Sequence, residues 1–190
     1  MPADVPTAAL VGAGLWVLWG ILHVYVLFHG LLVVSSQGVT GALEMLTGGI
    51  IVPKAIPPAD ERSSFAIGQL FKNFVIDVGG YGVLGFFVAY GIIDYQTPWI
   101  WYVVGVVTIG LADLAFLFQM VTSGVIKADA KTVGGPIVYF AAITVTPLGL
   151  PSGGLISPVA MSVVAGVTAV LLMALGKMQF SGLRNTTAQL

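Results

Sequence analysis

The sequence contains no cysteine, which excludes disulfides, thiolate metal ligands, iron–sulfur clusters and a cysteine nucleophile. Charge is also scarce: 8% of the residues are charged, and the formal net charge is -1. The seven Lys and Arg residues form no basic tract, so the chain lacks the positive surface that nucleic-acid binding requires. Nucleic acid is therefore excluded as a partner.

Signatures of metal and cofactor chemistry are missing as well. The chain has no HExxH, GxSxG, P-loop or GxGxxG pattern and no Asp-rich pyrophosphate-binding motif. His23 and His29 are separated by about 240° around a helix, so a regular helix cannot direct both at one metal ion or haem. The sequence predicts neither a metal site nor a cofactor.

Apolar residues dominate what is present. They make up 57% of the sequence, and the mean hydropathy is +1.01. A membrane-spanning helix needs about 20 mostly apolar residues, and the chain offers five candidate runs. The sequence therefore predicts one all-α integral membrane domain over residues 1–190, a bundle of five transmembrane helices at residues 8–34, 67–93, 99–123, 134–149 and 156–176.

Proline and glycine mark the limits of two predicted helices. Residues 36–66 include Pro57 and Pro58, which forbid a continuous helix, and an apolar stretch at residues 42–52 that can lie on or dip into the membrane. Before the fourth run, Gly134 and Gly135 precede Pro136, and proline is acceptable in the first turn of a helix. We therefore expect that helix to begin at residue 134.

The distribution of basic residues predicts the orientation. With five spans, six basic residues fall on one side of the membrane: Lys54, Arg62, Lys127, Lys131, Lys177 and Arg184. Basic residues are enriched on the cytoplasmic side, so we expect an outside N-terminus and a cytoplasmic C-terminus. The predicted location is the cell membrane, in particular a bacterial inner membrane.

A polar stripe runs along the second predicted helix. Gln69, Asn73, Asp77 and Tyr81 follow one another at i+4 spacing, which places them on one helix face. A carboxylate in the middle of a membrane helix costs on the order of 3 kcal/mol, so we expect Asp77 to face other helices or a cavity.

Three ionisable side chains share one predicted depth. Asp77, Asp113 and His23 each lie about 15 Å from the cytoplasmic ends of their helices. Helices 67–93 and 99–123 are joined by a short turn, so Asp77 and Asp113 can meet if both face inward, and one of two such carboxyls would be held neutral. A purely packing role for any of the three stays open.

Other side chains complete the candidate site. Asn73 and Gln119 are expected to line a path toward the cytoplasm, and Glu44 is a further candidate acid in an apolar stretch where solvated placement is equally open. The glycines of helix 67–93 are expected to permit close helix packing rather than ligand binding; they are Gly79, Gly80, Gly82 and Gly85. Trp16 and Trp19 can be packed, lipid-facing or functional.

Buried acids in an aromatic, water-poor bundle suit one reaction in particular. A neutral carboxylic acid can protonate the terminal alkene or epoxide of a polyprenyl substrate, and aromatic faces can stabilise the migrating cation. In size, five-span layout and embedded Asp and Glu residues, the chain resembles the small bacterial integral-membrane terpene cyclases that close farnesylated indoles into drimane-type sesquiterpenes. The resemblance implies a metal-independent cyclisation of a lipophilic substrate that enters from the bilayer.

The resemblance also implies roles for the embedded residues. The proton donor would be Asp77, Asp113 or Glu44. The other site residues would contact the substrate, with the aromatic ones stabilising the cation; these are Tyr81, Asn73, His23, Trp19, Phe116, Gln119 and Tyr139.

Two other classes of function fit the same composition. A proton-coupled small transporter would also place acids at mid-depth, although no internal repeat supports it. A structural or assembly subunit of a larger membrane complex would explain the glycine-rich helix faces. Lipids are expected partners, and the uncharged helix 156–176, which contains Gly166, leads us to expect a homo-oligomer.

Overall fold

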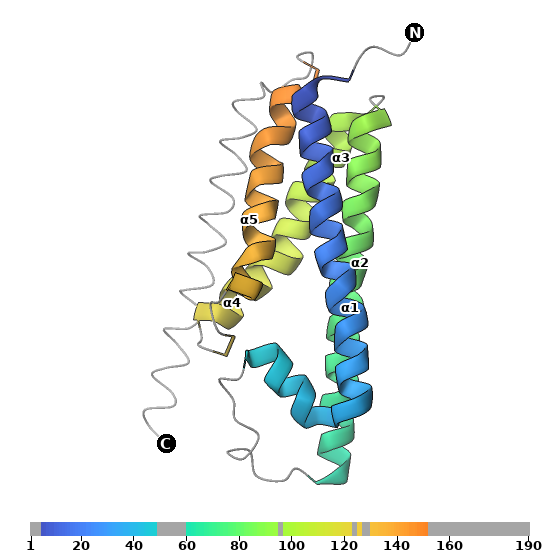
Figure 1. The fold of residues 1–190 in the computed structure, drawn as a ribbon, viewed down its shortest axis with the longest axis vertical. Helices are drawn as coiled ribbons and strands as arrows, with labels where there is room; N and C mark the ends of the chain where they lie inside the picture. Colours follow the sequence, from blue (N-terminus) through green and yellow to red (C-terminus); the bar gives the residue numbers. More distant parts are fainter. Residues whose placement is uncertain (1–4, 49–59, 95–96, 123–124, 127–129, 152–190) are drawn as a thin grey trace.

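The computed structural model describes residues 5–48, 60–94, 97–122, 125–126 and 130–151. Across this part of the chain every regular element is helical, and no strand is present. The elements are α1 (Thr7–Thr47), α2 (Glu61–Asp94), α3 (Pro98–Val104), the π-helical segment η2 (Gly105–Leu114), α4 (Ala115–Thr122), α5 (Ala130–Val145) and the 3-10 turn η3 (Thr146–Gly149) (Figure 1).

Four helices of this part are long and apolar enough to cross a membrane: Thr7–Thr47, Glu61–Asp94, Pro98–Thr122 and Thr132–Gly149. They confirm that the described part of the chain is all-helical and contains helices that could span a membrane. The predicted fifth helix at residues 156–176 falls outside the described residues. The five-span count and the orientation of the termini stay predictions.

Helix α1 is longer than the sequence predicted. It continues past residue 34 to Thr47 with a kink at Gly38, so most of residues 36–47, the first part of the expected connection, are helical. Ser35 and Ser36 donate hydroxyl hydrogen bonds to the carbonyls of Leu31 and Leu32 and are accommodated within the helix. The helix bends at Gly38, whose φ of 64° is readily adopted only by glycine, and its last turns diverge from the main axis in Figure 1.

The start of α2 also differs from the prediction, by six residues. Asp60 accepts a hydrogen bond from the Ser63 backbone N–H at 3.0 Å and another from the Ser63 hydroxyl at 2.6 Å. These bonds cap the first turn and lower the pKa of the Asp60 carboxyl, the hydroxyl bond contributing most. The capping residue therefore starts the helix ahead of the apolar run.

The fourth helix starts four residues earlier than expected, at residue 130 rather than about 134. Helix α5 begins at Ala130, and Pro136 lies inside it. Proline removes one backbone N–H donor, and here the helix continues through that loss. The Gly-Gly-Pro sequence therefore does not mark a boundary.

Helix α1 lies between α2 and α5, and its main contacts are with these two helices (Figure 1). Gly20 and Gly82 face each other where α1 meets α2: a Cβ added to Gly20 would lie 2.7 Å from the Gly82 carbonyl oxygen. Gly79 and Gly85 also pack against α1, as predicted. Gly80 does not, because an added Cβ there would meet nothing within 4 Å.

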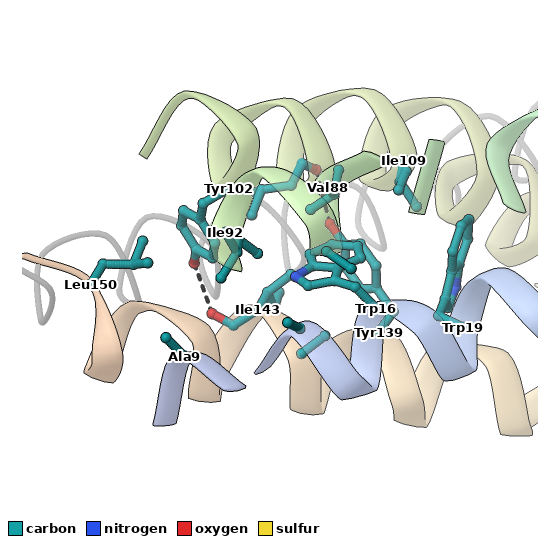
Figure 2. Packing of buried hydrophobic residues seen from close by; sticks show 14 of the residues in the cluster. Ala9, Trp16, Trp19, Val88, Ile92, Tyr102, Ile109, Tyr139, Ile143 and Leu150 are labelled. Atoms are coloured by element: carbon teal, nitrogen blue, oxygen red, sulfur yellow. Dashed lines mark hydrogen bonds between the residues drawn. The ribbon is translucent and has the colours of Figure 1, made fainter. Parts of the chain in front are cut away.

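The buried core joins α1, α2, α3, η2 and α5. Tyr102 donates its hydroxyl to the Ile143 carbonyl at 2.7 Å, which ties α3 to α5 (Figure 2). The fully buried side chains of this cluster include Trp16, Trp19, Val88, Ile92, Tyr102, Ile109 and Ala142.

Candidate functional site

His23 of α1 is held on one side by its own helix. Its Nδ1 lies 2.9 Å from the Trp19 carbonyl oxygen, one turn earlier. A carbonyl oxygen can only accept, so Nδ1 carries the hydrogen. The imidazole also stacks on the Trp19 ring, with 3.7 Å between centroids and 28° between planes. The ring orientation and the protonation of Nδ1 are therefore both determined locally.

On its other side, His23 meets Asp113. Nε2 lies 3.1 Å from Asp113 Oδ2, and the two side chains are only 12% and 13% exposed. Since Nδ1 keeps its hydrogen, a neutral ring presents a bare lone pair at Nε2, which would face a carboxylate lone pair. A hydrogen bond at this distance therefore requires one proton between Nε2 and Oδ2, either as imidazolium with carboxylate or as neutral imidazole with carboxylic acid.

Asp113 reaches this position from an unusual backbone. It lies near the end of η2, where ten residues adopt a π-helical form. Segments with i→i+5 bonding are rare and frequently mark functional sites. Gly105 and Gly110 admit aromatic side chains to the surface of the segment: the Trp16 ring packs on Gly105, and the Tyr139 hydroxyl lies at Gly110.

Tyr139 connects α5 to this segment. Its buried hydroxyl donates to the Val106 carbonyl at 2.8 Å. Its ring packs edge-on against Trp16 with 5.7 Å between centroids, and Trp16 in turn packs edge-on against Trp19 at 6.5 Å. An aromatic wall therefore extends from the His23–Asp113 pair through the core, as Figure 2 shows for Trp16, Trp19 and Tyr139.

Two polar groups of this wall lack a hydrogen-bond partner among the described residues. The indole N–H groups of Trp16 and Trp19 are buried, and within the described ranges neither donates a hydrogen bond. An unpaired buried donor costs about 1–3 kcal/mol, so both N–H groups would gain from an acceptor such as a water or a ligand oxygen.

Asp77 and Asp113, which could meet only if both faced inward, do not meet in the structure. Asp77 is exposed, and across the described part of the chain it makes neither a hydrogen bond nor an ion pair. His23 packs against Gly82, which is separated from Asp77 by about 140° around α2. At Gln69, Asn73 and Asp77, the polar stripe of α2 therefore points away from the His23–Asp113 pair.

The remaining predicted residues are dispersed. Tyr81 is half-buried against the core cluster, and Phe116 packs on Phe74 with 5.2 Å between centroids. Gln119 is half-buried in α4, and Glu44 is exposed beyond the bend of α1. Catalytic roles for Glu44 and Asp77 stay predictions from sequence. The structure brings together His23, Asp113, Trp19 and, through Trp16, Tyr139.

Two features of the site had no clear signal in the sequence. The π-helical form of η2 was not predicted, and only the spacing of Gly105 and Gly110 hints at an irregular segment. Trp16 was noted but not placed in the site, although it links Trp19 to Tyr139. In the part of the chain that the structure describes, no group of three His, Cys, Asp or Glu side chains could hold a metal ion.

No protein-family model matches the chain, and neither a curated protein nor a solved structure matches it. The chemistry of the His23–Asp113 pair therefore carries the functional inference.

Proposed function

We propose that this chain is a membrane-embedded enzyme that cyclises a lipophilic, prenylated substrate of the farnesyl-indole kind by acid initiation, without a metal ion. The supporting observation is the 3.1 Å contact between His23 Nε2 and Asp113 Oδ2, two side chains that are mostly buried; we infer that one proton lies between them. A positioned, protonated acid in a water-poor site is what alkene protonation requires.

The reaction balances without a co-reactant. The shared proton moves to a terminal alkene carbon of the substrate, and the π electrons of that alkene form the new C–H bond. The resulting cation is attacked by the next alkene, which closes a ring and moves the positive charge. Loss of a neighbouring proton from the last cation forms a new alkene, so the product is an isomer of the substrate.

The same pair serves as acid first and base afterwards. Once the proton has left, the lone pairs of Nε2 and Oδ2 face each other at 3.1 Å, an arrangement that favours recovery of a proton. The Trp19 carbonyl holds the hydrogen of Nδ1 throughout, so the ring cannot relieve the repulsion by changing tautomer. This geometry supports return of the final proton to the pair.

The aromatic wall supplies the second requirement. The faces of Trp and Tyr rings attract cations, and the effect increases where water is excluded. Trp19 adjoins the pair directly, and Trp16 and Tyr139 continue the wall from it. We propose that the substrate enters from the bilayer and lies against these rings.

The test is an assay of isolated membranes with a farnesylated indole and its epoxide, comparing the wild type with Asp113→Asn. The Asn amide can donate N–H to a neutral Nε2, which preserves the hydrogen bond but removes the transferable proton. We expect product formation to fall by at least about a hundredfold in a folded protein. Asp94→Asn, an exposed carboxyl at the end of α2, is the matched control and should leave the rate unchanged.

Full activity in Asp113→Asn would remove the pair from the mechanism. Absence of any cyclised product from the wild type would overturn the cyclase proposal and favour the transporter or the assembly subunit.

A further inference from the structure

One face of α2 is left exposed along much of its length by the residues that the structure describes. Its exposed residues recur at alternating steps of three and four, the heptad spacing of helices that pair with another helix. In the order of the chain they are Asn73, Ile76, Gly80, Val83, Phe87 and Tyr90, and we call this set the α2 seam. The larger apolar members are 45% to 67% exposed, so a continuous apolar surface is available.

The seam also carries groups that lipid cannot satisfy. The Asn73 amide, and that of Gln69 one turn earlier, are exposed and form no hydrogen bond across the described ranges. An amide both donates and accepts, so it can pair with its own copy across a two-fold axis. At Gly80 an added Cβ would meet nothing within 4 Å, which leaves the backbone open to a second helix.

Two opposite charges flank the seam. Lys72 precedes Asn73 and Asp77 follows Ile76, so in the heptad they occupy the positions on either side of the apolar line. Neither forms an ion pair in the part of the chain that the structure describes. Both are placed within an apolar helix, where an unpaired charge is costly.

Their spacing matches a parallel pair of helices. In a parallel two-helix pair, a residue directly before a seam position, such as Lys72 before Asn73, faces the partner helix. The residue that it meets there lies five places later in the sequence. Lys72 would then meet the partner's Asp77, and the two-fold axis repeats the contact. In an antiparallel pair, Lys72 and the partner's Asp77 would lie on opposite sides of the seam, so they could not form this ion pair.

We propose that a second copy of this chain covers the α2 seam, in a parallel two-fold dimer with Asn73 at the axis and two Lys72–Asp77 ion pairs between protomers. The inference is independent of the proposed cyclase activity, because it uses none of the residues of the His23–Asp113 site. It also differs from the homo-oligomer expected from helix 156–176, since the contact surface is α2.

Cysteine crosslinking tests the contact, since the chain has no native cysteine. Ile76→Cys and Val83→Cys each place one thiol on the seam, close to its copy across the axis. The control is Leu32→Cys on α1, at a position that is 69% exposed but off the seam. Under mild oxidation in native membranes, we expect disulfide-linked dimers from both seam variants at yields at least about tenfold above the control. Equal yields from all three variants would overturn the proposal.

Exchanging the charges of Lys72 and Asp77 tests whether the partner on the seam is a second copy of this chain and whether it lies parallel. In the Val83→Cys background, Lys72→Glu alone and Asp77→Lys alone should each reduce crosslinking by about tenfold or more, because each leaves like charges opposed. Lys72→Glu combined with Asp77→Lys should restore it, since the pairs form again with reversed signs. Failure of the double variant to recover, or a disulfide of Val83→Cys to a different protein, would overturn the dimer.

Discussion

Each nitrogen of the His23 ring has a defined partner, and this determines what the site can do. The Trp19 carbonyl accepts the hydrogen of Nδ1, so Nδ1 keeps it. Within the pair, only His23 Nε2 and Asp113 Oδ2 can therefore gain or lose a proton. A lone embedded Asp could be explained by packing, but a carboxyl that lies 3.1 Å from an oriented imidazole has the geometry that the proposed proton transfer needs.

The pair also contributes to stability, and substitution of Asp113 can separate this role from catalysis. In Asp113→Leu the buried Nε2 loses its partner, so we expect the free energy of unfolding to fall by about 1–3 kcal/mol. Asp113→Asn keeps a donor for Nε2 and should unfold close to the wild type. Thermal unfolding of both variants in the same detergent measures the difference, and equal destabilisation of the two would contradict this proton assignment.

At the scale of elements, close helix packing and the π-helical segment position the site. Gly20 and Gly82 bring the backbones of α1 and α2 into contact directly beside His23. The wider turn of η2 alters which residues of the third span face inward and places Asp113 opposite His23. Tyr139 then fastens the segment to α5 through the Val106 carbonyl.

The glycine contact makes a prediction about helix packing. In Gly20→Ala the new methyl group would lie 2.7 Å from the Gly82 carbonyl oxygen, a backbone atom that cannot rotate away. We expect a loss of about 1–3 kcal/mol in the free energy of unfolding from this overpacking. The matched control is Gly14→Ala in the same helix, where an added Cβ meets nothing within 4 Å. That variant should be neutral or slightly stabilising, because alanine is the better helix former. Equal unfolding temperatures for the two variants would contradict the packing at Gly20.

At the scale of the whole molecule, the polar groups divide into two sets. One set, His23 and Asp113, is enclosed by α1, η2 and their neighbours, and the other, with Asn73 and Asp77, lies on the outer face of α2. Enclosure suits proton chemistry, whereas an exposed polar face in a membrane helix suits contact with another helix. The proposed site and the proposed dimer surface therefore lie on different faces of the described helices.

The number of spans is tested by labelling single cysteines with a membrane-impermeant maleimide. Ser63→Cys and Thr97→Cys lie at opposite ends of α2, so we expect them to label from opposite sides, with position 97 outside. Thr186→Cys, beyond the described residues, should label from the same side as position 63 if there are five spans. Labelling of positions 97 and 186 from one side would exclude the five-span arrangement.

Hydropathy and length alone determined that the chain is helical and apolar enough for membrane spans, because about 20 apolar residues can satisfy their backbone in lipid only as a helix. Counting residues along the helices also predicted that His23, Asp77 and Asp113 share one depth, and two of them, His23 and Asp113, meet in the structure. Boundaries were less predictable, since α1 accommodates Ser35 and Ser36 by bonding their hydroxyls to its own carbonyls, and the cap at Asp60 starts α2 ahead of its apolar run.

Only the tertiary structure decided which partner Asp113 takes. Depth follows from the rise per residue, but the direction of a side chain depends on the rotation of each helix about its axis. That rotation is determined by packing at Gly20 and Gly82 and by the π-helical turns of η2, neither of which leaves a periodic pattern in the sequence. For this reason Asp113 meets His23, and Asp77 faces outward from the described bundle.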